Sequence, residues 1–359
     1  NAMKESEFIV IQELINTQII KKYSLLSQTE YSKTNPISKE NHLKWKYLQN
    51  PEGFSYGTNG YCEDKLIARI SYQKKNFFLK NKIIKGANLC DLLIHKNNRK
   101  LDNFLKLASQ FFIRKDIPES ELSIMLPNEI SINIYKKILN LNPIGSLELR
   151  VIPIINSIIY KKFNFINLNF LSNFSYKFIK FLNKNIKNIS KIKFSKKDVS
   201  NDEYEKMIKI FYQDNLIQGE RSKKWIQWRY SSNSSINYFL EYIFFGDKLI
   251  GYFAYRKTEK DGFQILVIME IVMIKKNILI EITILLKLVS IAIKQKCDLI
   301  LSLRTFQKNN PLSNLFFPKI PNFLLPTPLE LFIITNAESS SEIFDINKWK
   351  INMADLDIF

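Results

Sequence analysis

Few side chains of this 359-residue chain could act through a metal or a thiol. It has two histidines, His42 and His95, and three cysteines, Cys62, Cys90 and Cys297. The cysteines are far apart and form no CxxC pair, so we expect no metal site and no disulfide framework. Unpaired cysteines fit a reducing compartment, which predicts a cytoplasmic protein. Histidine is a common general base, but a single histidine at a strand end, such as His95, is more often structural.

The chain is strongly basic, with a formal net charge of +19. Such a charge indicates nucleic acid or an anionic membrane surface first. Only eight of the 53 basic residues are arginine, the residue best suited to reading phosphates and base edges. Residues 160–197 contain ten lysines and no acidic residue, so about half of the excess charge lies in this one segment. Transfer RNA is therefore an alternative partner and not the first expectation.

One sequence pattern occurs twice in the same register. WKYLQN begins at Trp45, and WRYSSN begins at Trp228, 183 residues later. DKLI begins at Asp64 and again at Asp247, with the same offset. Two such matches are hard to obtain by chance, and a repeat of this length indicates two duplicated domains instead of a solenoid. The expected parts are a first domain at residues 3–158, a basic linker at residues 159–198 and a second domain at residues 199–359.

Both copies show a hairpin followed by strands that alternate with helices. Asp64-Lys65 and Gly246-Asp247 are turn signals between apolar runs, which predicts the two hairpins. In the first copy we expect strands at 87–94, 121–126 and 147–154 and helices at 102–114 and 131–139. In the second copy we expect strands at 263–274, 298–303 and 330–335 and helices at 279–294 and 309–317. This order predicts an α/β (α+β) fold in which each domain has a mixed, mostly antiparallel sheet flanked by helices.

Two segments bear on a membrane location. Residues 171–187 would place apolar side chains on one face of a helix and lysines on the other. Such a helix more often packs on a domain than on a lipid surface, so peripheral membrane contact is the alternative. The most apolar stretch, residues 278–293, contains Glu281 and Lys287 and is too short and too charged to span a bilayer. No transmembrane segment is expected.

Several motifs of the first copy occur together in one known family. These are HLKWKYLQNPEG from His42, a strand ending DLLIH, the basic turn KNNRK, and LPNEISINIYKKILNLNPI, which ends just after Pro143. Together they resemble the GCN5-related N-acetyltransferases (GNAT). With the tail WKINMADLDIF, they resemble more narrowly the tandem-domain GNAT proteins of bacterial surface-polysaccharide gene clusters. The resemblance covers nearly the whole chain and implies two GNAT-like domains, acetyl-CoA as cofactor and acyl transfer to an amine or hydroxyl.

The resemblance also locates the cofactor turn. GNAT enzymes hold the CoA pyrophosphate on backbone N–H groups at a helix N-terminus, reached through a glycine-rich turn. Leu101 and Asp102 stand here where the glycines belong, and we expect Asp102 to cap the helix, bond its first amides and repel phosphate. The second copy has Lys275 and Lys276 at this place and no glycine. The cofactor-binding residues implied by the resemblance are Ile94, His95, Arg99, Lys100, Leu101, Asp102, Asn103 and Ser131.

Two further residues match catalytic positions of the family. By resemblance, Asn128 holds the cofactor arm and Tyr135 protonates the departing thiolate. Tyrosine suits this role because its unperturbed pKa of about 10 keeps it protonated at neutral pH. An equally plain reading makes Tyr135 a core or rim aromatic, since aromatic residues make up 13% of the chain. No general base is evident; Glu129 and His95 are near the site only in sequence.

Three functions remain open at this point. The first is an acyl-CoA-dependent N- or O-acetyltransferase acting on a sugar nucleotide or polysaccharide precursor, with its cofactor site in the first domain. The second is a non-catalytic GNAT-fold binding or scaffold protein, which the loss of both glycine turns favours. The third is a Fem-like aminoacyl-tRNA-dependent transferase, which also has two GNAT-like domains and needs no CoA turn. Whether the chain is an enzyme is therefore undecided, and the retention of Asn128 and Tyr135 favours the first function.

Overall fold

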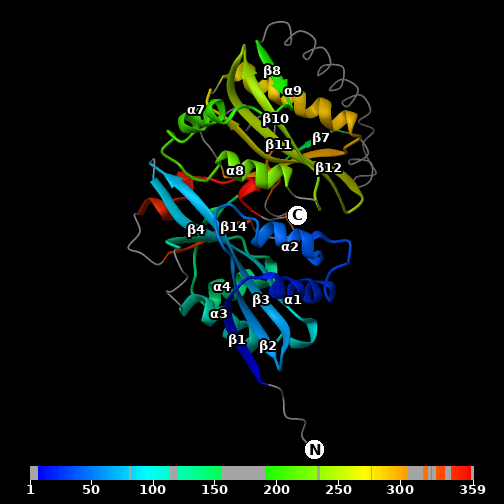
Figure 1. The fold of residues 1–359 in the computed structure, drawn as a ribbon, viewed down its shortest axis with the longest axis vertical. Coiled ribbons are helices and arrows are strands. Elements are labelled where there is room, and N and C mark those ends of the chain that lie inside the picture. The colour runs from blue at the N-terminus through cyan, green and yellow to red at the C-terminus, as the bar shows by residue number, and fades with distance from the viewer. Residues whose placement is uncertain are drawn as a thin grey trace, which may run out of the picture. The chain divides into compact units, whose positions relative to one another are not determined.

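The chain forms two compact units, each built around a sheet of its own (Figure 1). The computed structural model describes residues 7–80, 82–113, 120–154, 191–232, 235–275, 277–305, 318–321, 325, 329–335 and 341–356. Unit 1 comprises Asn1–Gly145, Ile217–Ile236 and Glu330–Asp345. Unit 2 comprises Ser146–Leu216, Asn237–Leu329 and Ile346–Phe359. The predicted α/β class with two mixed sheets is confirmed.

Unit 1 has a long sheet with helices on both faces. Its strands, in spatial order, are β1 (Phe8–Leu14), β2 (Tyr56–Cys62), β3 (Lys65–Leu79), β4 (Lys82–Ile94), β5 (Leu122–Met125), β14 (Glu330–Thr335) and β6 (Pro143–Ser146). A short strand, β9 (Ile217–Gly219), also pairs with β3. One apolar core joins α1 (Thr17–Gln28) and α2 (Glu40–Tyr47) to the sheet. The opposite face packs on α3 (Leu101–Ile113) and α4 (Glu129–Lys137). The unit also contains α8 (Lys223–Ile226), a π-helical turn (Gln227–Ser231) and 3-10 turns at Pro36–Ser38, Lys96–Asn98 and Ser341–Phe344.

Unit 2 repeats this plan with fewer helices among the residues described. Its strands, in spatial order, are β7 (Glu148–Pro153), β13 (Leu299–Arg304), β12 (Phe263–Met273), β11 (Lys248–Lys260), β10 (Tyr238–Phe245) and β8 (Ile192–Ser195). The apolar helix α9 (Ile278–Lys294) packs on one face, and α7 (Asn201–Phe211) contacts β11 from the other through Tyr204 and Tyr252. Short elements at Ile346–Lys348, Trp349–Lys350 (β15) and Met353–Asp355 complete the unit.

Both predicted hairpins are confirmed. Strands β2 and β3 pair antiparallel across a turn in which Glu63 has φ +53°. Strands β10 and β11 do the same across Gly246, whose φ of +63° suits a residue without a Cβ. The predicted helices at 102–114, 131–139 and 279–294 correspond to α3, α4 and α9. The predicted helix at 309–317 and the amphipathic segment 171–187 lie outside the described residues.

Two strands join a different sheet from the one that their order in the sequence predicts. The segment 147–154 was expected to close the first sheet, but β7 pairs with β13 of unit 2, with Val151 opposite Leu301. The segment 330–335 was expected in the second sheet, but β14 pairs with β5 of unit 1, with Ile333 opposite Ile124. Strand β14 carries buried Leu331, Phe332 and Ile333, so it suits the interior of a sheet. Both units are therefore discontinuous in sequence. Of the predicted linker at residues 159–198, the structure describes residues 191–198, which include the strand β8 of unit 2.

Each sheet contains a parallel strand pair that ends at a β-bulge. In unit 1, β4 and β5 pair from Gly86 opposite Leu122 to Leu89 opposite Met125, and the bulge in β4 follows at once. In unit 2, β12 and β13 pair up to Ile268 opposite Ser302, and a bulge in β12 follows at once. Bulges bend a strand away from its neighbour. In open α/β sheets, ligands bind at the carboxyl ends of parallel strands, where these bulges lie.

Candidate functional site

The turn that follows β4 is folded around its own polar groups. His95 caps the 3-10 turn Lys96–Asn98, and its Nδ1 accepts a hydrogen bond from the Asn97 N–H at 3.3 Å. The Asn98 N–H donates to the His95 carbonyl at 2.8 Å. Arg99 lies across the turn, and its Nε donates to the Ile94 carbonyl at 3.0 Å. The predicted residues Ile94, His95 and Arg99 are thus brought together in one compact turn.

A carboxylate from a distant segment fills this turn. Glu30, which follows α1, accepts a hydrogen bond from the Lys96 N–H at 3.0 Å. Its other oxygen forms an ion pair with the Arg99 guanidinium. The Glu30 side chain is only 11% exposed in this contact. The turn therefore gathers cationic and N–H donors around an anion, and that anion belongs to the chain itself. Sequence reasoning missed Glu30 because nothing local links it to Lys96 and Arg99, which are 66 and 69 residues away.

The first turn of α3 differs from the prediction in one respect. The helix begins at Leu101, so Asp102 is its second residue and not its N-cap, which corrects the predicted capping role. A carboxylate in a first helical turn still complements the helix dipole, and it still opposes a phosphate. Asn103 donates from Nδ2 to the Asn98 carbonyl at 2.9 Å, and the Lys100 N–H donates to the same carbonyl at 2.8 Å. Leu101 is half exposed.

Asn128 and Ser131 form the N-terminal cap of α4. The Asn128 Oδ1 accepts hydrogen bonds from the Ser131 N–H and the Ser131 hydroxyl, both at 2.9 Å. The Ser131 side chain is buried. The two predicted residues therefore lie together, and in this structure they stabilise the start of the helix.

Tyr135 lies within the apolar core under α4. Its ring contacts Phe104 of α3 edge-on at a centroid distance of 5.8 Å and Phe332 of β14 at 6.4 Å. It is 5% exposed, and burial raises the pKa of its hydroxyl well above the usual value. The hydroxyl thus keeps its proton at any physiological pH. This environment fits the alternative that Tyr135 is a core aromatic residue. The role of Tyr135 as a proton donor stays a prediction.

The β4 bulge is built around a carboxylate that sequence reasoning did not single out. Asp91 occupies the bulge with φ +55°, and its side chain is 8% exposed. Its Oδ2 forms an ion pair with Lys46 Nζ at 3.0 Å and accepts a hydrogen bond from the Tyr47 hydroxyl. The fully buried guanidinium of Arg69 lies 3.9 Å from the same oxygen. Lys46 and Tyr47 of the repeated motif thus stabilise the bulge. The sequence feature that could have pointed to Asp91 is a single aspartate inside the apolar run ANLCDLLI.

In unit 2, the segment between β12 and α9 corresponds to the turn after β4, and it has different polar groups. Asn277 caps α9 by accepting the Leu279 N–H at 2.8 Å. Lys275 lies over the Phe245 ring at 4.3 Å. Lys276 lies outside the described residues. Over the part of the chain that the structure describes, no group of His, Cys, Asp and Glu could hold a metal ion, and no helix is long and apolar enough to cross a membrane.

No protein-family model matches the sequence, and no curated protein matches it either. Solved structures do match in fold. Saccharomyces cerevisiae N-myristoyltransferase with bound myristoyl-CoA is 12% identical, with a TM-score of 0.59 over 94% of this chain and 84% of that one. A GCN5-related N-acetyltransferase from Kribbella flavida is 8% identical, with a TM-score of 0.56 over 91% and 71%. One from Anabaena variabilis is 11% identical, with a TM-score of 0.55 over 92% and 73%. The fold of the chain is therefore that of two GNAT-like domains.

Proposed function

We propose that the chain is an acyl-CoA-dependent transferase whose cofactor site lies in unit 1, at the carboxyl end of β4. The observation that carries the proposal is the turn at residues 95–99, which wraps a cation and an N–H donor around a carboxylate beside the β4 bulge. A solved structure of the same fold binds myristoyl-CoA. The resemblance of the sequence supports an amine or hydroxyl of a sugar nucleotide or polysaccharide precursor as the acceptor, and the unpaired cysteines support a cytoplasmic location.

The donors of the turn have the chemistry that a pyrophosphate needs. A guanidinium and backbone N–H groups form strong hydrogen bonds with phosphate oxygens, as they do here with Glu30. Arg99, the Lys96 amide and the nearby Lys100 would hold the phosphates after the Glu30 carboxylate has moved away. The cofactor would supply an activated thioester. The glycines that normally bring the backbone close are absent, so these side chains would carry more of the binding.

Residues of α4 would then position the proton donor and protonate the departing thiolate. Asn128 and Ser131 fix the start of α4, and the helix fixes Tyr135 one turn further on. Because burial raises the pKa of the Tyr135 hydroxyl, this group is protonated and could return a proton to a thiolate only if the core around it opens. Tyr135→Phe should therefore slow thiol release from bound acyl-CoA and leave cofactor affinity unchanged.

Calorimetric titration tests the proposal directly. Acetyl-CoA and myristoyl-CoA are titrated into the native protein, Glu30→Gln and a control, Glu40→Gln, which removes an exposed carboxylate paired with Lys44. Glutamine keeps an acceptor for the Lys96 N–H but removes a charge that opposes the phosphates. We expect native binding and a roughly tenfold tighter Kd for Glu30→Gln, which corresponds to about 1.4 kcal/mol. The control should bind as the native protein does.

The contact of Glu30 with Lys96 and Arg99 also favours a second function, that of a non-catalytic GNAT-fold binding protein. Glu30 and Asp102 both place negative charge where the phosphates would lie. If the native protein, Glu30→Gln and Asp102→Gly all fail to bind either acyl-CoA, the transferase proposal is wrong and this function replaces it. Salt-sensitive binding of transfer RNA in the same preparation would instead support the Fem-like alternative.

A further inference from the structure

One end of unit 2 gathers exposed apolar side chains. It consists of the start of β8 (residues 191–193), the turn between β10 and β11 (245–248) and the first turn of α9 with the residues before it (275–281), and we call it the β8–α9 end (Figure 1). Within the described part of unit 2, four large apolar residues are exposed, and three of them lie here. They are Ile278, Leu279 and Phe245, with exposures of 56%, 46% and 38%. Single exposed apolar residues are ordinary, whereas a group of them indicates a contact surface.

Backbone pairing and one side-chain contact hold the three segments together. Phe245 pairs with Ile192 of β8. The Ile274 N–H donates to the Ile250 carbonyl at 3.0 Å, which keeps the chain after β12 beside β11. The Nζ of Lys275 then lies 4.3 Å from the centre of the Phe245 ring. The first turn of α9, which carries the other two apolar residues, follows within four residues of this contact.

The same end has an excess of positive charge. Its charged side chains, among the residues described, are four lysines and two carboxylates: Lys191, Lys193, Lys248, Lys275, Asp247 and Glu281. Asp247 is engaged by Lys193, with Nζ and Oδ1 3.2 Å apart, and Glu281 is half-buried. The other three lysines are exposed. The apolar group is therefore bordered by ammonium groups that an anionic partner would neutralise.

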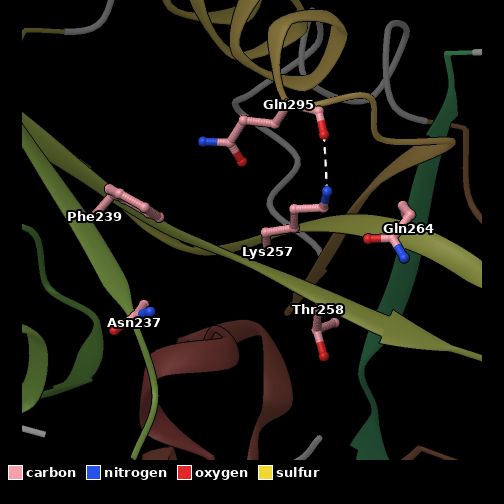
Figure 2. A pocket seen from close by; sticks show the side chains of 6 residues that line it. All are labelled: Asn237, Phe239, Lys257, Thr258, Gln264 and Gln295. Carbon is pink, nitrogen blue, oxygen red and sulfur yellow. Dashed lines mark hydrogen bonds between the residues drawn. The ribbon is translucent and has the colours of Figure 1, made fainter. Parts of the chain in front are cut away.

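The opposite end of the same sheet differs in its apolar residues. Figure 2 shows this end, where Lys257 donates to the Gln295 carbonyl at 2.9 Å beside a cavity and Phe239 is half-buried. Exposed lysines occur there too, among them Lys260 and Lys294. None of the exposed large apolar residues of the described chain lies at that end. Charge alone thus does not distinguish the two ends, and the apolar group does.

Exposed apolar side chains bordered by lysines suit an anionic lipid surface. Aliphatic tips enter the boundary between headgroups and acyl chains, while lysine stems extend and keep their ammonium groups among the phosphates. A nucleic acid would leave the aliphatic side chains of Ile278 and Leu279 unused, and Lys275 already occupies a face of the Phe245 ring that a base could stack on. Residues 160–197 contain no acidic residue, so that segment does not complement the charge of the end.

From these features we infer that the β8–α9 end of unit 2 docks on an anionic lipid surface. Ile278 and Leu279 enter the interface, and Lys248 and Lys275 contact the headgroup phosphates. This docking does not depend on the acyl transfer proposed for unit 1. It is measured without an acyl donor, so the two proposals can fail separately.

The test is co-sedimentation of the full-length protein with lipid vesicles at physiological salt. The vesicles contain phosphatidylcholine alone or phosphatidylcholine mixed with phosphatidylglycerol. The native protein should bind the mixed vesicles and bind the neutral ones much more weakly. Lys248→Gln/Lys275→Gln should weaken binding to the mixed vesicles roughly ten- to thirtyfold, since each lysine near such a surface contributes about fivefold. Ile278→Gln/Leu279→Gln should weaken it about tenfold through lost apolar burial.

Two matched controls separate this end from the rest of the unit. Lys260→Gln/Lys294→Gln removes the same charge at the opposite end, and Ile210→Gln replaces the fourth exposed apolar residue, on α7. Both should bind as the native protein does, and thermal unfolding checks that every variant is folded. The inference is wrong if the native protein does not bind the mixed vesicles, or if either variant of the β8–α9 end binds them no more weakly than its control. Loss of vesicle binding in the lysine variant alone, together with loss of transfer RNA binding, would identify a nucleic-acid surface instead.

Discussion

A single carboxylate, Asp91, links the repeated motif to the candidate cofactor site. Lys46 and Arg69 are almost fully buried, with exposures of 1% and 0%, and both lie within 4 Å of its Oδ2. Burying two cations is costly unless an anion compensates them. Asp91 lies in the bulge that ends the β4–β5 pairing. The geometry of the bulge and the burial of the two cations therefore depend on each other.

Replacing this carboxylate should therefore destabilise the protein strongly. Asp91→Asn keeps the side-chain shape and tolerates the positive φ, but it leaves Lys46 and Arg69 without their counter-ion. We expect the free energy of unfolding to fall by about 3–5 kcal/mol in urea denaturation. Asp64→Asn, at an exposed hairpin turn, should cost less than about 0.5 kcal/mol. Equal effects of the two changes would show that the buried charges are compensated in another way.

Glu52 should make the stability depend on pH. Burial raises the pKa of its carboxyl from 4.5 to about 7, although Lys75 and the Asn76 N–H oppose this. The folded state then binds a proton that the unfolded state has lost, so stability falls as pH rises from about 4.5 to about 7. Glu52→Gln should flatten this fall by roughly 1–3 kcal/mol across the window, measured by urea denaturation at several pH values. Glu121→Gln, at an exposed position, should keep the native slope.

At the scale of the elements, the repeat has a physical meaning. Trp45 of α2 and Trp228 of the π-helical turn stack with centroids 4.9 Å apart and planes inclined by 17°. Each indole N–H donates to the other residue's carbonyl, at 2.8 Å and 2.9 Å. The two copies of the motif are thus partners within unit 1. The sequence shows that the motif is repeated, but it carries no sign that the partner of each tryptophan is the other.

A double-mutant cycle tests this pairing. Trp45→Phe and Trp228→Phe each remove one indole N–H and leave one buried carbonyl without its donor. Each should lower the free energy of unfolding by about 1–3 kcal/mol. Because the residues contact each other, the double variant should lose less than the sum by about 0.5–3 kcal/mol. Additive losses would mean that the two side chains act independently.

The elements also show where sequence reasoning succeeds. The helices α3, α4 and α9 and both hairpins were predictable because their signals are local: apolar periodicity, a cap residue and a turn. Strand β1 and helix α1 were not predicted, although Asn16 caps α1 by accepting from Gln18 and Ile19. At the candidate site, the resemblance to the GNAT family pointed to Asn128, Ser131 and Arg99. Glu30 was not predicted, because its ion pair with Arg99 joins segments with no shared pattern.

At the scale of the whole molecule, chain order and unit membership differ. Strand β7 precedes the expected linker yet pairs in the sheet of unit 2, and β14 lies near the C-terminus yet pairs in the sheet of unit 1. The segment Ile217–Ile236, which carries Trp228, also belongs to unit 1. Whether a strand joins one sheet or the other is decided by long-range pairing, which leaves no local trace in the sequence.

Because each unit draws on both halves of the chain, neither half should fold alone. A fragment of residues 1–170 lacks β14 and Trp228, so β5 would have an open edge and Trp45 no partner. A fragment of residues 171–359 lacks β7, the strand beside β13. We expect each fragment alone to show no cooperative thermal unfolding and to aggregate, and the co-expressed pair to purify as a complex with a single cooperative transition. A cooperative transition in residues 1–170 alone would show that unit 1 folds without β14 and Trp228, and it would contradict the prediction that each unit needs strands from both halves of the chain.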